Sequence, residues 1–66
     1  MTPQEVRDRV DRIRDEKGDP ELAHGAEDSL WADVLKAIAA GAKGRSRDLA
    51  TEALKTKDIS FGRWCA

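Results

Sequence analysis

Apolar residues recur at helical spacing in three segments of the chain, and each segment predicts one helix. The first, residues 3–17, carries a narrow apolar stripe that suits a single groove. The second, residues 20–40, has an apolar face too broad for one neighbour, and the third covers residues 46–57. The apolar positions are, in chain order, Val6, Val10 and Ile13; Leu22, Ala23, Ala26, Leu30, Val34, Ala37 and Ile38, widened by Trp31 and Leu35; and Leu49, Ala50, Ala53 and Leu54.

Capping residues mark both ends of the first predicted helix. Thr2 is expected at the N-cap and Pro3 at the first helical position, where its missing N–H costs nothing. Glu5 completes a Thr-x-x-Glu capping box. Gly18 is expected to end the helix as a left-handed cap.

The other two helices have similar boundary signals. Asp19 and Pro20 predict the start of the second helix, and Gly41 predicts its end. Gly25 lies inside this helix, and we expect the helix to continue through it, straight or slightly kinked. Ser46 is expected to cap the third helix.

The C-terminal residues 58–66 are too few for another long helix but include Ile59, Phe61 and Trp64. We expect this tail to fold back and close the bundle. The alternative is an exposed aromatic anchor for another protein. The predicted fold is therefore all-α, a single domain over residues 1–66 consisting of a small three-helix bundle with a C-terminal tail packed on it.

Composition narrows the possible classes of protein. A chain of 66 residues buries a small core, and its single cysteine, Cys65, permits no internal disulfide. A partner subunit could supply the missing stability, which favours a homodimer. We expect no signal peptide and no membrane helix, and hence a cytoplasmic protein. The net charge of −1 argues against strong nonspecific binding of nucleic acid.

Glu27 is the one carboxylate on the broad apolar face of the second helix. A charge there is costly unless it is paired. We expect a buried ion pair with Arg9, Arg12 or Arg14 of the first helix, or else a role for Glu27 in an interface.

Glu21 and His24 have the i, i+3 spacing that metal-binding helical bundles use. On a helical wheel, however, Glu21, His24 and Asp28 lie beyond the apolar face, whereas Glu27 points into it. A metal-binding helical dimer is therefore a remote alternative, and we expect no cofactor. We also expect no enzyme activity, because the chain has no nucleophile elbow, phosphate loop or pair of inward acids.

The second and third helices and their glycine-containing loop resemble the spacing of a helix-turn-helix, which makes DNA binding the main alternative function. The loop of about five residues is long for that motif, and helix three offers no Asn or Gln to read bases. The basic residues of this region are Lys43, Arg45, Arg47, Lys55 and Lys57.

Parts of the chain resemble small uncharacterised proteins of actinobacteria and their bacteriophages. The resemblance rests on Ala-His-Gly-Ala-Glu-Asp-Ser-Leu-Trp-Ala-Asp-Val-Leu at residues 23–35, Ala37-Ile38, and the ending Asp-Ile-Ser-Phe-Gly-Arg-Trp-Cys-Ala at residues 58–66. It implies a short cytoplasmic accessory protein and carries no known activity or site.

The expected function is protein–protein interaction, including self-association. A core of this size cannot bury every large apolar side chain. The residues expected to contact a partner are Trp31, Leu35, Phe61 and Trp64.

Overall fold

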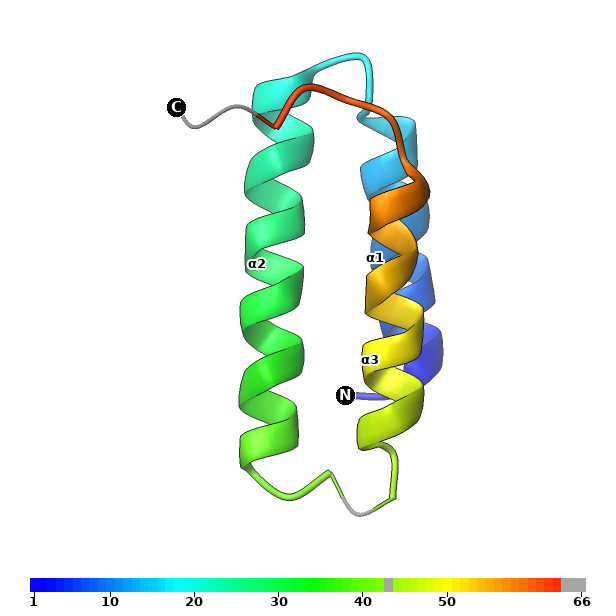
Figure 1. The fold of residues 1–66 in the computed structure, drawn as a ribbon, viewed down its shortest axis with the longest axis vertical. Helices are drawn as coiled ribbons and strands as arrows, with labels where there is room; N and C mark the ends of the chain where they lie inside the picture. The colour runs from blue at the N-terminus through cyan, green and yellow to red at the C-terminus, as the bar shows by residue number, and fades with distance from the viewer. Residues whose placement is uncertain (43, 64–66) are drawn as a thin grey trace.

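The computed structural model describes residues 1–42 and 44–63. Helix α1 (Pro3–Asp15) runs up, α2 (Pro20–Ala39) runs down, and α3 (Ser46–Leu54) runs up again, as Figure 1 shows. A short 3-10 helix, η1 (Lys55–Asp58), extends α3, and residues 59–63 then cross towards the start of α2. The predicted all-α three-helix bundle is confirmed.

Helix α1 begins as the sequence predicted but ends two residues earlier. The Thr2 hydroxyl accepts a hydrogen bond from the Glu5 backbone N–H at 3.2 Å, and Pro3 is the first helical residue. The left-handed cap predicted at Gly18 is wrong, because this glycine has no positive φ. The chain turns instead through a hydrogen bond of 2.9 Å from the Asp19 N–H to the Glu16 carbonyl, which needs no left-handed residue.

Helix α2 is continuous through Gly25, as predicted. Its N-cap, Asp19, accepts a hydrogen bond from the Leu22 N–H at 3.2 Å. Regular helix ends at Ala39, and Gly41 follows with a φ of 85°, a left-handed conformation that favours glycine.

Substitution by alanine should therefore have opposite effects on the free energy of unfolding at Gly25 and at Gly41. Gly25→Ala is expected to stabilise the fold by about 0.5–1 kcal/mol, because a Cβ at this helical site meets nothing within 4 Å. Gly41→Ala is expected to destabilise it by about 1 kcal/mol, because its positive φ strains an alanine. Thermal unfolding of the two variants would measure both effects, and a shift of the same sign in both would contradict the prediction.

Helix α3 differs from its prediction at both ends. Ser46 is the first helical residue and does not cap the helix; Arg45 occupies the N-cap, with no side-chain hydrogen bond. The backbone decides this, because the Arg45 carbonyl already accepts from the Leu49 N–H at 2.8 Å. The α-helical part ends at Leu54, and the predicted stretch to residue 57 tightens into η1.

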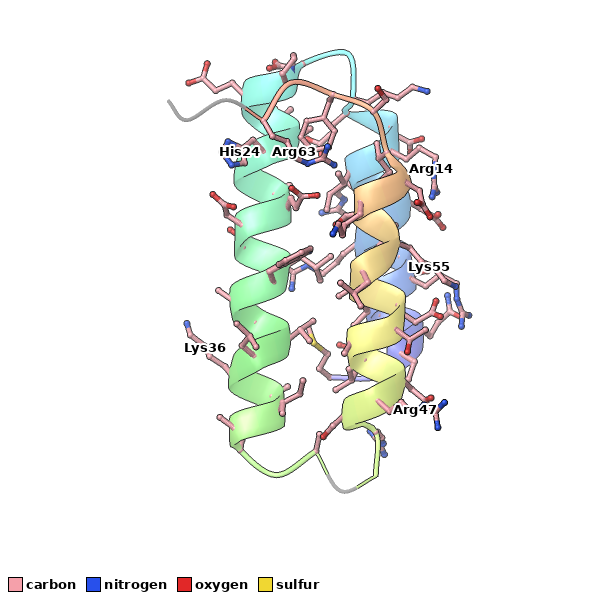
Figure 2. All side chains as sticks on the ribbon, in the orientation of Figure 1. Arg14, His24, Lys36, Arg47, Lys55 and Arg63 are labelled. Atoms are coloured by element: carbon pink, nitrogen blue, oxygen red, sulfur yellow. The ribbon has the colours of Figure 1, made fainter. Side chains whose placement is uncertain are left out.

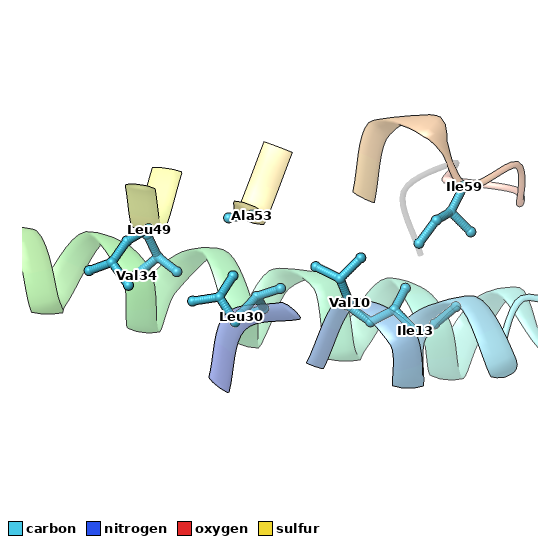
Figure 3. Packing of buried hydrophobic residues seen from close by; sticks show 9 residues of the cluster. Val10, Ile13, Leu30, Val34, Leu49, Ala53 and Ile59 are labelled. Carbon is cyan, nitrogen blue, oxygen red and sulfur yellow. The ribbon is translucent and has the colours of Figure 1, made fainter. Parts of the chain in front are cut away.

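All three helices and the C-terminal segment contribute to one core (Figure 3). Ile59 is buried in it, and Phe61 is partly buried against it. The predicted packing of the tail is thus confirmed for its described part, whereas Trp64 lies outside the described residues. The core residues are Val6, Val10, Ile13, Ala23, Leu30, Val34, Leu49, Ala53 and Ile59. Within residues 1–42 and 44–63, the helices are too short or too polar to span a bilayer.

Candidate functional site

Helices α2 and α3 leave large apolar side chains exposed next to each other. Leu35 is 65% exposed, Leu54 52% and Trp31 38%. They surround a hollow of about 300 Å³ between the two helices. We call this surface the α2–α3 face; its residues are Trp31, Val34, Leu35, Ile38, Ala50, Ala53 and Leu54.

The apolar arc of α2 is wider than its two neighbours can cover. Leu30 and Val34, at the centre of the arc, are buried in the core. Trp31 and Leu35 lie at its edge and remain exposed, although the Trp31 indole reaches Thr56 of η1. The broad apolar face of α2 was predicted to contact more than one neighbour. Both α1 and α3 pack against its centre, and its edge, with Trp31 and Leu35, remains exposed.

A hydrogen bond ties the Trp31 ring to the bundle. Its indole N–H donates to the hydroxyl of Thr56 at 3.1 Å, and Thr56 is completely buried. An indole with its N–H satisfied exposes mostly hydrocarbon. Trp31 is thus a pre-oriented apolar group on the α2–α3 face.

The chemistry of the α2–α3 face is limited to apolar contact. Its seven residues carry one side-chain polar atom, the indole nitrogen, and Thr56 already occupies it. None of the seven can serve as an acid, a base, a nucleophile or a metal ligand. What the surface can do is bury the apolar side chains of another molecule.

Glu27 forms a buried ion pair, but with Arg63 and not with an arginine of α1. The Arg63 guanidinium donates to both oxygens of the carboxylate, at 2.8 and 3.1 Å, and Glu27 is only 8% exposed. Arg9 instead lies 2.8 Å from Asp33. The predicted partner was wrong because the C-terminal segment crosses the bundle and places Arg63 nearer to Glu27.

Arg63 also holds the C-terminal segment together. It donates to the backbone carbonyls of Thr56 and Ile59 at 2.8 and 2.9 Å, and its guanidinium lies 3.7 Å from the centre of the Phe61 ring. Burial raises the pKa of Glu27, but hydrogen bonds from Arg63 and Thr56 outweigh it and hold that pKa below its ordinary value. One sequence signal could have identified Arg63, since it is the single cation in residues 59–66.

The structure brings together only some of the residues predicted to contact a partner. Trp31 and Leu35 share the α2–α3 face, whereas Phe61 packs beside Arg63, and Trp64 lies outside the described residues. Leu54, which was predicted to face inward, is exposed on the face. On a helical wheel Leu54 points to a different side of α3 from the buried Leu49. This angular separation could have predicted from the sequence that Leu54 is exposed.

The candidate metal residues do not converge. His24 Nε2 lies 3.6 Å from Asp28 Oδ2 on the same helix. Within residues 1–42 and 44–63, no three His, Cys, Asp or Glu side chains gather closely enough to hold a metal ion.

The orientation of α3 differs from that of a recognition helix. Figure 1 shows α2 and α3 lying nearly antiparallel, whereas the helices of a helix-turn-helix cross at about 90–120°. Of the basic residues in this region, Lys55 is paired with Glu52 at 2.8 Å, and Lys43 lies outside the described residues. Arg45, Arg47 and Lys57 are exposed.

Comparisons of the chain with models of protein families, with curated proteins and with solved structures find no match. The resemblance to small actinobacterial and phage proteins thus stays a prediction from the sequence. Among the described residues, the α2–α3 face is the most distinctive surface, because it gathers three large exposed apolar side chains around one hollow.

Proposed function

We propose that this protein acts by binding another polypeptide chain through the α2–α3 face. One observation carries the proposal: Trp31, Leu35 and Leu54 are exposed together around a hollow whose only side-chain polar atom is already bonded. Contiguous apolar surface of this kind is typical of interaction sites. Tryptophan in particular is enriched among the residues that dominate binding energy.

A protein partner suits this surface better than a small ligand. Small-molecule sites add a few polar groups that orient the ligand, and the α2–α3 face offers none that is unbonded. Apolar side chains from a helix need no such groups, because the helix satisfies its own backbone. The proposed role is that of a cytoplasmic accessory protein without enzymatic activity, the kind that the sequence resemblance implies.

Site-specific photo-cross-linking would test this proposal. The photoreactive amino acid p-benzoylphenylalanine would replace Leu35 on the face or, as a control, Arg12 on the exposed side of α1. In cells that make the protein naturally, we expect a discrete cross-linked adduct from position 35 and none from position 12. Adding Leu54→Asp should abolish the adduct, because it places a charge on the apolar surface.

Two outcomes of the cross-linking experiment would contradict binding of another chain at the α2–α3 face. Position 35 could yield no adduct, or the same adducts as position 12. Either outcome would show that the α2–α3 face does not bind another chain.

A further inference from the structure

A connected set of hydrogen bonds runs from the C-terminal segment (residues 59–63) to the α2–α3 face. Arg63 reaches into the space between α2 and η1 (Figure 2) and donates to both oxygens of Glu27 at 2.8 and 3.1 Å. Thr56 also bonds to the Glu27 carboxylate, and its hydroxyl accepts from the Trp31 indole N–H at 3.1 Å. Of the seven residues of the face, Trp31 alone has a side-chain polar atom that such a contact can hold.

The charge of Glu27 fixes the direction of these hydrogen bonds. The pKa of Glu27 lies below its ordinary value of 4.5, so its carboxylate is ionised at neutral pH and can only accept. The hydroxyl hydrogen of Thr56 is therefore directed at Glu27, and the hydroxyl oxygen is left to accept from Trp31. Thr56 is completely buried, so solvent does not compete for its hydroxyl. The acceptor that holds the indole is thus oriented by Glu27.

The other contacts of Arg63 tie its position to the packing of the whole C-terminal segment. Its guanidinium donates to the Ile59 carbonyl at 2.9 Å and lies 3.7 Å from the centre of the Phe61 ring. It also donates to the backbone carbonyl of Thr56 at 2.8 Å. Displacing the segment would therefore remove Arg63 from Glu27 and Thr56 together.

From this connection, and resting on the proposed function, we infer that the C-terminal segment controls how tightly the α2–α3 face binds its partner. Thr56 is the positioning residue for the Trp31 indole. Arg63 and Glu27 hold Thr56 in place, so release of the segment would free the indole. A side chain that is already fixed in its binding orientation loses less conformational entropy on association. Trp31 is 38% exposed, so it can be held at its N–H and still contact a partner.

Nuclear magnetic resonance of the indole N–H would test the positioning in the free full chain. The chain has two tryptophans, and the signal that persists in Trp64→Phe belongs to Trp31. Thr56→Val keeps the shape of the side chain but removes the hydroxyl. The Trp31 signal should then move upfield, and its proton should exchange with solvent about fivefold faster or more. Thr56→Ser retains the hydroxyl and should restore most of the wild-type shift and exchange rate.

Arg63→Ala tests the link to the C-terminal segment. It should change the Trp31 signal in the same direction as Thr56→Val, because it removes the contacts to both Glu27 and Thr56. Arg7→Ala is the matched control, since Arg7 pairs at 2.9 Å with Glu52, a second buried glutamate, which bonds otherwise to Lys55. It should leave the Trp31 signal unchanged. Circular dichroism would identify a temperature at which the compared variants are folded.

The photo-adduct from position 35 would report the effect on binding. Thr56→Val and Arg63→Ala are each expected to lower its yield about threefold or more, because the freed indole must be ordered again on association. Thr56→Ser should restore most of the yield that Thr56→Val loses. Arg7→Ala should leave the yield unchanged.

Each adverse outcome separates this inference from the proposed function. An unchanged Trp31 signal in Thr56→Val would overturn the positioning role. A changed signal with an undiminished adduct would overturn the control of binding. In both cases an adduct from position 35 of the otherwise wild-type chain leaves the proposed function standing. Absence of that adduct would overturn the proposed function and, with it, the control of binding.

Discussion

Replacing Leu30 by alanine is expected to unfold a large part of the protein at room temperature. Leu30 lies at the centre of α2 and is completely buried in the core. A buried leucine truncated to alanine costs about 2–5 kcal/mol. A chain of this size rarely has more than about 3–5 kcal/mol of net stability. The loss is therefore comparable to the entire stability, and circular dichroism during thermal and urea unfolding would measure it.

Leu22→Ala is the matched control for this prediction. The chemical change and the helix are the same, but Leu22 is 53% exposed, so the free energy of unfolding should change by less than about 0.5 kcal/mol. All variants should be compared at one protein concentration, because association would add to the apparent stability. Equal losses for the two variants would show that burial of Leu30 does not stabilise the bundle as the structure indicates.

Replacing Arg63 by alanine should lower the free energy of unfolding by about 1–3 kcal/mol near neutral pH. The change leaves Glu27 buried without its cation and removes the hydrogen bonds to the carbonyls of Thr56 and Ile59. Removing one partner of a fully buried pair costs about 3–5 kcal/mol, but Arg63 is about one-third exposed, which reduces the effect. Chemical denaturation of wild type and variant would give the difference.

The effect of Arg63→Ala should depend on pH. The pKa of Glu27 in the folded protein lies below its ordinary value of 4.5, so the ion pair contributes fully above that value. Its contribution is lost as the pH falls through the lowered pKa. In the variant, burial without Arg63 is expected to raise the pKa of Glu27, so protonation relieves the unpaired charge. The stability gap between wild type and variant should therefore begin to narrow above pH 4.5, as Glu27 of the variant takes up a proton, and should narrow further below about 4.5, as the wild-type ion pair is lost.

Arg12→Ala serves as the control, because Arg12 is exposed on α1. It should change stability little and open no gap that depends on pH. If the gap for Arg63→Ala had the same size at neutral and acidic pH, the loss would come from the stacking on Phe61 and the backbone contacts, and the charge of Glu27 would contribute nothing.

Local sequence signals sufficed for the starts of α1 and α2. The caps Thr2 and Asp19 act through atoms three residues away, so the short sequence around each contains all the participants. The same holds for the apolar stripe of α1, whose three members are all buried. Such features need only helical geometry and the tendency of apolar side chains to leave water.

Local sequence signals gave the wrong cap where two neighbouring residues, or two turn conformations, were both compatible with the local sequence. Either Arg45 or Ser46 could occupy the N-cap of α3, and the backbone hydrogen bond from the Leu49 N–H to the Arg45 carbonyl places Arg45 there, with Ser46 as the first helical residue. At Gly18 a left-handed cap and an ordinary turn were both available. The backbone adopts the ordinary turn, in which the Asp19 N–H donates to the Glu16 carbonyl and α2 begins at the next residue.

By itself, then, the sequence determined that the chain forms three helices and which side of each is apolar, and it favoured the packing on the bundle that the structure shows for Ile59 and Phe61. Only the tertiary structure decided that Glu27 pairs with Arg63 and that Leu54 joins Trp31 and Leu35 on the α2–α3 face. The physical reason is the difference in range. Helices and their apolar sides follow from contacts within a few residues, whereas Glu27 and Arg63 are 36 residues apart and meet only once the helices have packed. Likewise, the exposed edge of α2 depends on how its neighbours pack against it in three dimensions.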